Sequence, residues 1–302
     1  MTGVWVCLAW LSASPDTLAA NLAIVLSDNS APYQEVFEAI RSSAEDRVSV
    51  TRVYAEDATE AALNARLVVA VGVRAAESVA NIPGRAPVLV VLVPKEWYLK
   101  SGRQRLIGNV RRSVSALYLD QPYARQAHLV RLAFPNVKRV GVLVSAAQSA
   151  VHEEIATALR SQGLTLVGEV LEPDQKLIAP LERLFSMADL MLAVPDAEVF
   201  NRSTAQSVLL TSYRYRDPVV GYSHSLTRAG ALVSLYSTPG QIGRQAAELI
   251  GKQFESAYSH LPNPAYPRYF SVSVNQQVAR SLGFIMLPEA ELERRLAGSS
   301  DD

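Results

Sequence analysis

Short, unbroken apolar runs recur along this chain, and longer stretches of mixed polar and apolar residues separate them. Examples are LVVAV at residues 67–71, VLVVLV at 88–93 and RVGVLV at 139–144. A strand buried on both faces of a parallel sheet loses the alternation of a half-exposed strand, so these runs predict buried parallel strands. Strands are expected at residues 22–26, 48–53, 67–71, 88–93, 140–144, 165–170, 190–194, 218–221, 231–236 and 269–274.

In the stretches between these runs, apolar residues recur at the spacing of amphipathic helices. Helices are expected at residues 33–44, 58–64, 74–80, 124–134, 147–162, 177–185, 199–213 and 242–256. Strand and helix therefore alternate almost throughout, which is typical of doubly wound α/β units.

The alternation occurs in two blocks, which predicts two Rossmann-like lobes with parallel sheets. The first block ends near Pro94, residues 95–121 depart from it with strand-like pieces at 106–110 and 115–119, and the second block begins at Pro122. Three crossovers forming a hinge are expected near residues 118–122, 234–238 and 262–268. We assign residues 21–118 and about 236–264 to lobe 1, residues 119–235 and about 265–297 to lobe 2, and residues 298–302 to a disordered tail.

The first twenty residues have the order of a secretory signal. Residues 4–13 are almost wholly apolar, and the small residues Ala19 and Ala20 follow a polar stretch. The run is about half as long as the roughly 20 residues of a membrane-spanning helix. No Lys or Arg precedes it, and the alternative is a first strand of a cytosolic domain. We predict a signal peptide at residues 1–20, cleavage between residues 13 and 21, and a periplasmic protein.

Cysteine content and charge narrow the classes of function. The single cysteine, Cys7, lies in the predicted signal, so the mature chain would have no disulfide and no thiolate metal site. The 29 basic and 29 acidic residues balance, which argues against electrostatic capture of nucleic acid or an anionic membrane. With 302 residues and 49% hydrophobic content, the chain is long enough to bury two cores.

Candidate binding residues follow from the predicted strand ends. In parallel α/β sheets, ligands bind beyond the carboxyl ends of the strands, where helix N-termini present free amide groups. The alternative for Ser27, Ser145 and Asp196 is that they only cap helices. The predicted ligand-binding residues are Ser27, Asp28, Tyr33, Gly72, Val73, Arg74, Pro94, Ser145, Ala146, Pro195, Asp196, Tyr222 and Ser223.

Catalytic and cofactor patterns are missing from the sequence. The histidines at positions 128, 152, 224 and 260 lack metal-binding spacing with one another or with a cysteine. Ser223 and His224 are adjacent, but no G-x-S-x-G elbow surrounds them. The segment AVGVRAAES has one glycine where a dinucleotide fingerprint needs three, and no Walker lysine is present. We therefore expect no cofactor, no metal and no enzymatic activity.

Several segments resemble one known family. ADLMLAVPDAEV, DPVVGYSHSLTRAGALVSLYSTPGQIGRQAAELI and FSVSVNQQVARSLGF are similar to the second half of ABC-transporter substrate-binding proteins, which include tryptophan- and tyrosine-binding members. LVVAVGVRAAESVA and LAFPNVKRVGVLVS fit the same pattern earlier in the chain. The resemblance implies a type I periplasmic-binding-protein fold, in which two lobes close on a ligand by hinge motion.

Departures from the family pattern bear on the ligand. Val73 and Arg74 follow Gly72 where the family usually has Thr, and Ala197 replaces a common Asn. The opening loop SDNSAPY also lacks the family's usual His-Pro pattern. Arg74 begins a predicted helix, where free amides already favour negative charge, and its guanidinium could hold a carboxylate or phosphate. We predict an anionic or amino-acid-like small organic ligand; the alternative is that Arg74 points into solvent.

The partners follow from the same resemblance. The chain is expected to be a monomeric solute-binding component that delivers its ligand to an ABC permease and ATPase, with no nucleic acid as partner. The alternative is a periplasmic sensing domain that reports the same kind of ligand to a membrane sensor.

Overall fold

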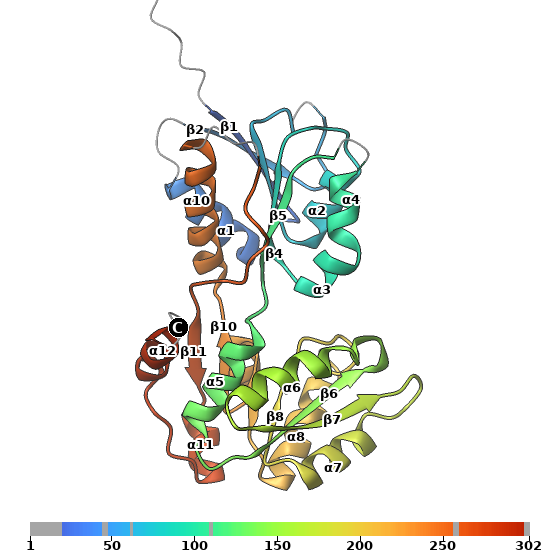
Figure 1. The fold of residues 1–302 in the computed structure, drawn as a ribbon, viewed down its shortest axis with the longest axis vertical. Coiled ribbons are helices and arrows are strands. Elements are labelled where there is room, and N and C mark those ends of the chain that lie inside the picture. Colours follow the sequence, from blue (N-terminus) through green and yellow to red (C-terminus); the bar gives the residue numbers. More distant parts are fainter. Residues whose placement is uncertain (1–19, 44–47, 61–62, 109–110, 256–259, 299–302) are drawn as a thin grey trace, which may run out of the picture.

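The computed structural model describes residues 20–43, 48–60, 63–108, 111–255 and 260–298, which fold into two α/β lobes (Figure 1). Of the predicted signal peptide only Ala20 is among these residues, so that prediction and its cleavage site lie outside the described residues. The predicted tail lies outside them from residue 299 onward.

The sheet of lobe 1 has five parallel strands in the order β2-β1-β3-β4-β5. Strand β3 (Leu67–Val71) shows how an unbroken apolar run is used. Its residues Val68 and Ala70 pack in one apolar cluster, and the alternate residues Leu67, Val69 and Val71 pack in another. Alternate side chains point to opposite faces, so the run fills two cores. The other strands are β1 (Ala20–Leu26), β2 (Val48–Tyr54), β4 (Val88–Val93) and β5 (Val114–Tyr118).

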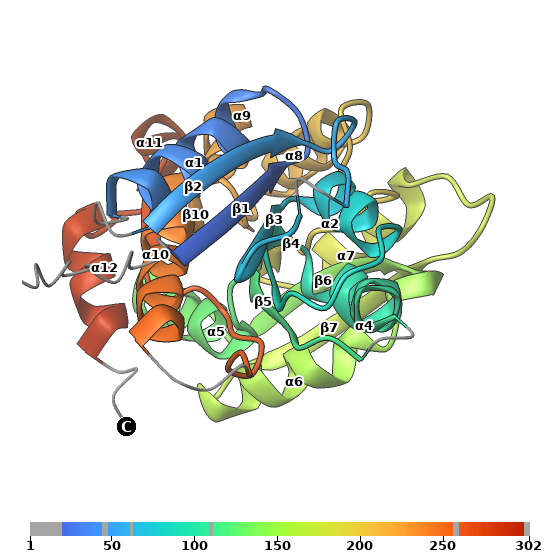
Figure 2. The same cartoon turned by 90° about the horizontal axis from the view of Figure 1, so that it is seen from above.

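Helices cover both faces of this sheet (Figure 2). On one face, α1 (Ala31–Ser43) packs along α10 (Pro239–Glu255), and Val36 and Ile242 share a cluster with β1 and β3. On the other face lie α2 (Val73–Ala80) and α4 (Arg103–Ile107). The short α3 (Lys95–Trp97) and the π-helical turn η1 (Tyr98–Gly102) connect β4 to α4. Among the described residues, no helix is long and apolar enough to cross a membrane.

Lobe 2 contains a six-stranded sheet in the order β11-β10-β9-β8-β6-β7, in which only β11 runs antiparallel to its neighbour. Its strands are β6 (Arg139–Ser145), β7 (Thr165–Leu171), β8 (Leu190–Leu192), β9 (Val219–Gly221), β10 (Val233–Tyr236) and β11 (Ser271–Val274).

Two groups of helices bury the faces of this second sheet. The apolar cluster on one face contains side chains of α5 (Tyr123–Ala133), α6 (Val151–Ser161), α11 (Gln276–Leu282) and α12 (Glu289–Gly298). The cluster on the other face contains side chains of α7 (Ile178–Met187), α8 (Ala205–Tyr215) and α9 (His224–Ala229). A 3₁₀ turn, η2 (Ala146–Gln148), follows β6.

The chain passes between the lobes three times, at residues 119–122, 237–238 and 260–270 (Figure 1). Two hydrogen bonds join the three passages. The Gln121 amide donates to Ser237 Oγ over 2.7 Å, and Ser237 Oγ donates to the Tyr269 carbonyl over 2.5 Å. Two α/β lobes with mostly parallel sheets and three connections confirm the predicted fold class.

Two of the predicted elements are wrong. Leu106 and Ile107 belong to α4 rather than to a strand, while residues 109–110 lie outside the described residues. Residues 58–60 and 63–64 are not helical, and 61–62 lie outside the described residues. Helices α11 and α12 are not among the predicted elements, because each is short and buries only one or two side chains, so its apolar periodicity is weak.

Candidate functional site

Ser27 and Gly72 meet where β1 and β3 end. Ser27 Oγ donates to the Val71 carbonyl over 2.9 Å and accepts from the Ala75 amide over 3.0 Å, so the buried hydroxyl ties both strands to α2. A Cβ atom at Gly72 would lie 2.5 Å from Ser27 Oγ and 2.7 Å from Tyr33 Cε1, and φ of Gly72 is +88°. Only glycine fits this close approach. Three of the predicted residues therefore form one packed unit.

Asp28 and Arg74 lie at the exposed side of the same strand ends. Asp28 Oδ1 accepts the Ser30 amide over 2.8 Å, and hydrogen bonds from Ser30 lower the pKa of Asp28. Arg74 Nη2 lies 3.3 Å from Glu56 Oε2, with both side chains more than half exposed. Val73 is the first residue of α2. The Arg74 guanidinium thus already has acidic neighbours, and its role as anchor for an anion stays a prediction.

The end of β4 is irregular. Leu92 has φ 60°, and the register with β5 shifts between Val91 and Val93. A positive φ is rare for a bulky residue, and such bulges redirect the chain where a strand ends. Pro94 follows as the N-cap of α3, and its carbonyl accepts the Tyr98 amide over 3.1 Å.

Lys95, directly after Pro94, connects the lobes. Its amide donates to Asp120 Oδ2 over 2.7 Å, and its Nζ lies 2.8 Å from Glu154 Oε1 of lobe 2. The same Nζ lies 5.3 Å from the ring centroid of Tyr266 in the third passage. Burial lowers the pKa of Lys95, but Glu154 and Tyr266 outweigh it and the pKa is raised. Burial also raises the pKa of Asp120.

Asp196 organises the strand ends of lobe 2. Its buried carboxylate accepts the Ser145 amide over 2.7 Å through Oδ2 and the Glu198 amide over 2.9 Å through Oδ1. The loop after β8 is thereby tied to the end of β6. Ala146 begins η2, and the Pro195 carbonyl accepts Gln148 Nε2 over 3.4 Å. The structure therefore brings Ser145, Pro195 and Asp196 together.

Tyr222 and Ser223 follow β9. Ser223 is the N-cap of α9, and its Oγ accepts the Leu226 amide over 3.2 Å. The Tyr222 ring lies edge-on to Phe200, with centroids 6.0 Å apart. Burial raises the pKa of Tyr222, and the charge of Asp196 adds to the effect. Capping is thus an established role of Ser223, whereas a ligand contact stays a prediction.

Contacts across the lobes come from residues that the sequence analysis did not select. Besides the Lys95–Glu154 pair, Lys100 Nζ donates to the Ala147 carbonyl over 3.2 Å. Lys95 and Lys100 follow β4, while Ala147 and Glu154 follow β6. The rule that selected Pro94 and Ala146 would have found Lys95 and Ala147 one residue further on. Among the described residues, no hydrogen bond, ion pair or ring contact joins the predicted residues of one lobe to those of the other.

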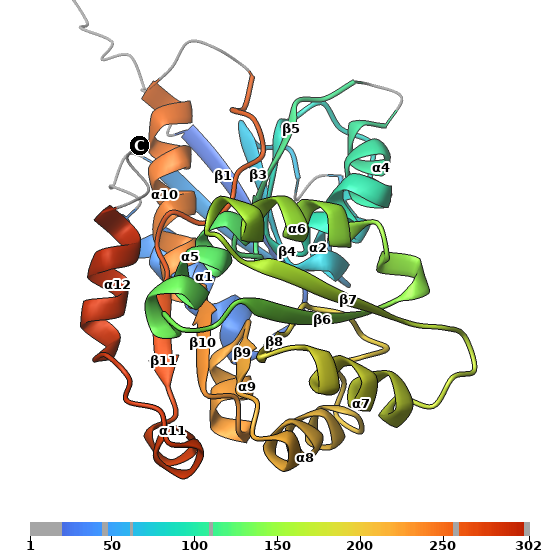
Figure 3. The same cartoon turned by 60° about the horizontal axis from the view of Figure 1, so that its bottom comes forward.

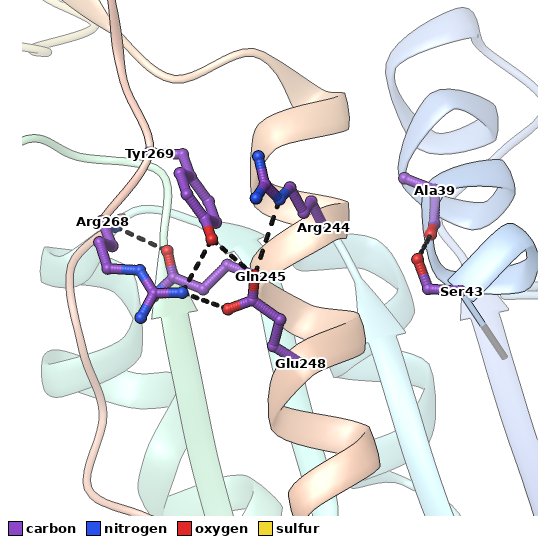
Figure 4. A network of polar contacts seen from close by, with 7 residues as sticks. All are labelled: Ala39, Ser43, Arg244, Gln245, Glu248, Arg268 and Tyr269. Carbon is purple, nitrogen blue, oxygen red and sulfur yellow. Dashed lines mark hydrogen bonds and ion pairs between the residues drawn. The ribbon is translucent and has the colours of Figure 1, made fainter.

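The third passage is fastened to α10 by a polar cluster (Figure 4). Arg268 forms an ion pair with Glu248, and Tyr269 donates its hydroxyl to Glu248 Oε1 over 2.6 Å. The Arg268 amide donates to Gln245 Oε1 over 2.6 Å, and the Arg244 guanidinium lies 4.2 Å from the Tyr269 ring centroid. The geometry of this passage is therefore held by lobe 1.

The described part of the chain contains no cluster of metal-binding side chains, and His224 packs against an aromatic ring. No group of three or more His, Cys, Asp or Glu side chains there could hold a metal ion. The His224 ring stacks on Tyr236, with centroids 5.8 Å apart and an interplanar angle of 24°. A ligand contact by either group of strand-end residues stays a prediction.

Solved structures of substrate-binding proteins share this fold. The ligand-free, open form of a substrate binding protein with adhesive properties from Clostridium difficile has a TM-score of 0.70 and 15% identity, over 90% of this chain and 97% of that one. The ABC domain from Streptococcus pneumonia in complex with L-Trp has a TM-score of 0.58 and 17% identity, over 90% and 97%. An arabinose binding protein from Geobacillus stearothermophilus has 0.54 and 12%, over 86% and 98%.

The structural similarity establishes the type I periplasmic-binding-protein fold. At identities this low it does not identify the ligand. Among curated proteins, none matches the chain in sequence. The family model for ABC transporter substrate binding protein matches residues 41–294, which is most of the chain. This match confirms the resemblance and the expectation of a binding protein rather than an enzyme. The chain therefore belongs to the ABC transporter substrate-binding protein family.

Proposed function

We propose that this chain is the periplasmic solute-binding component of an ABC uptake system and holds a small organic ligand between its two lobes. The observation that carries the proposal is the contact between the strand ends of the two lobes. Lys95 and Lys100, which follow β4, contact Glu154 and Ala147, which follow β6. The carboxyl ends of parallel strands, where α/β proteins bind ligands, therefore face each other across the interlobe region.

The ligand-binding residues belong to this proposal. The Ser27–Tyr33–Gly72 unit with Asp28, Val73, Arg74 and Pro94 would line lobe 1. The loops containing Ser145, Ala146, Pro195, Asp196, Tyr222 and Ser223 would line lobe 2. Because the buried Ser27 and Asp196 side chains are engaged within their own lobes, we infer that they position the loops and that the ligand meets backbone amides and aromatic rings.

Export and the transport partners complete the proposal. The apolar residues 4–13 support a cleaved signal, and family membership supports a permease and an ATPase as partners. Finding Met1 intact on soluble cytoplasmic protein from the native host would contradict export while leaving ligand binding open.

Mass spectrometry of the small molecule that co-purifies from the native host tests the function. The identified compound would then be titrated by calorimetry into the parent chain and two variants. Arg74→Ala tests the anionic anchor. Arg214→Ala is the matched control, because Arg74 and Arg214 are both about 60% exposed and lie 3.3 and 3.4 Å from a glutamate oxygen.

We expect Arg74→Ala to weaken binding of the co-purified compound about tenfold to a hundredfold, since one hydrogen bond to a charged group contributes about 1.5–3 kcal/mol. Arg214→Ala should bind like the parent chain. Equal affinity of Arg74→Ala and the parent would remove Arg74 from the site. Failure of any small molecule to co-purify or bind would contradict the proposed function itself.

A further inference from the structure

Lobe 2 contains a cavity of about 500 Å³ that none of the predicted ligand-binding residues lines. Its walls come from α8, the start of β9, the end of α9 and α11. These elements gather at the end of lobe 2 that points away from lobe 1 (Figures 1 and 3). The volume lies in the range of small-molecule sites, about 300–1,000 Å³.

The walls are mainly apolar. Leu209 and Leu210 of α8 face the cavity together with Val219 of β9 and Val278 and Leu282 of α11. Leu210 is 60% exposed, so its side chain is accessible to a ligand. Moving the apolar part of a ligand from water onto these side chains would therefore be favourable.

Asp217 contributes a carboxylate to these apolar walls. Helix α8 ends with Arg216 in the left-handed region, and the Asp217 amide donates to the Ser212 carbonyl over 3.1 Å. This turn places Asp217 at the cavity, half-buried. Among the described residues, no hydrogen-bond donor to its carboxylate is present. Burial raises the pKa of Asp217 to about 6; the charge of Asp189 adds to the effect and Arg139 opposes it.

Four further polar residues line the cavity: Arg202, Gln206, Ser212 and Tyr213. Arg202 precedes the other end of α8, whose eleven residues extend over about 16 Å. Arg202 lines the same cavity and adds a cationic group at its other end. Tyr213 is 54% exposed and presents an aromatic ring, a surface that attracts organic cations.

We propose that this cavity is a small-molecule site, separate from the interlobe region, that takes an organic ammonium ion. The charged nitrogen pairs with the Asp217 carboxylate, and the apolar body packs against Leu209, Val278 and Leu282. An ammonium group would form an ion pair with this carboxylate, whereas an anionic group would be repelled by it.

The test uses 2-phenylethylamine as probe and the purified full chain, with binding followed by shifts of backbone amide signals in NMR spectra. The neutral 2-phenylethanol and the anionic phenylacetate, of nearly the same size, serve as control ligands. Asp217→Asn removes the charge at the cavity. Asp174→Asn is the matched control, because Asp174 is an exposed carboxylate of the same lobe outside the cavity lining.

We expect 2-phenylethylamine to shift amide signals of α8 and α11 with a Kd on the order of 1 mM at pH 7.5. Binding should be at least tenfold weaker for Asp217→Asn and unchanged for Asp174→Asn. At pH 5 the carboxylate is only about one-tenth ionised, so the parent chain should bind about tenfold more weakly than at pH 7.5.

Equal binding of 2-phenylethanol or phenylacetate would overturn the proposal, as would equal binding by Asp217→Asn. No shift in α8 and α11 at 10-fold excess over the expected Kd would overturn it as well. Shifts confined to the strand ends at Gly72 and Ser223 would instead place the amine in the interlobe region. The cavity proposal does not rest on the interlobe function, so either can fail alone.

Discussion

Asp196 joins two loops of lobe 2 through one buried carboxylate, which accepts the amides of Ser145 and Glu198. Asp196→Ala would leave the buried Ser145 amide without a partner, and an unpaired buried donor costs about 1–3 kcal/mol, whereas the amide of the exposed Glu198 can bind water. We expect the free energy of unfolding to fall by about 1–3 kcal/mol, measured by urea denaturation. Glu198→Ala keeps its backbone amide and should change stability by less than about 0.5 kcal/mol. Similar losses in both variants would show that the carboxylate does not hold these loops.

The raised pKa of Asp217 predicts that the stability of the chain depends on pH. Its pKa is near 3.8 in the unfolded chain and about 6 in the folded one, so the folded chain binds the proton more tightly. The contribution of Asp217 to the free energy of unfolding is present at low pH, where the carboxyl group is protonated. It is lost as the pH rises from about 4 to about 6. Urea denaturation should show the parent losing stability relative to Asp217→Asn across this window. A constant difference between the two chains would mean that the pKa of Asp217 is not raised.

Helix α8 ends with a residue in an unfavourable conformation. Arg216 is exposed and has φ 61° and ψ 22°, in the left-handed region that costs a side-chain-bearing residue about 1–2 kcal/mol. Arg216→Gly relieves this cost, but glycine gains freedom in the unfolded chain. We expect a net stabilisation of about 0.5–1 kcal/mol in urea denaturation.

The control for this prediction is a second helix end. Helix α11 ends at Gly283, with φ +81° and no atom within 4 Å of a Cβ built there. Gly283→Ala therefore tests the conformation without a steric clash, and it should destabilise the chain by about 1 kcal/mol. If Arg216→Gly destabilises the chain instead, the Arg216 side chain makes contacts that outweigh its backbone strain.

At the scale of the whole molecule, the Lys95–Glu154 ion pair connects the two lobes. Exposed ion pairs contribute about 0–1 kcal/mol, so Glu154→Gln should hardly change the free energy of unfolding. We expect it to change the arrangement of the lobes, because one of the contacts between them is weakened. Small-angle X-ray scattering of the ligand-free chain should show a larger radius of gyration.

Arg183→Gln is the matched control, since Arg183 Nη2 lies 2.8 Å from Glu169 Oε2 within lobe 2. That variant should scatter like the parent chain. An unchanged radius of gyration in Glu154→Gln would show that the three covalent passages alone set the arrangement of the lobes.

The buried strands and the two-lobed α/β architecture could be predicted from the sequence because their signal is local. An unbroken apolar run such as residues 67–71 has one stable location, between two layers of helices. The strand ends then indicated which loops carry candidate residues, and Gly72, Ser27 and Tyr33 do lie together. A short helix such as α11 could not be predicted, because one N-cap and one buried side chain produce no clear period.

Only the tertiary structure decided which polar groups meet. Lys95 and Glu154 are 59 residues apart in the chain, and Ser145 and Asp196 are 51 apart. Such pairs depend on how whole elements pack, which leaves no trace in local periodicity. The cavity at Asp217 likewise needs α8, β9, α9 and α11 in place before it exists. Hydrophobic burial is thus encoded along the chain, whereas the partners of its charged groups are set when the folded elements come together.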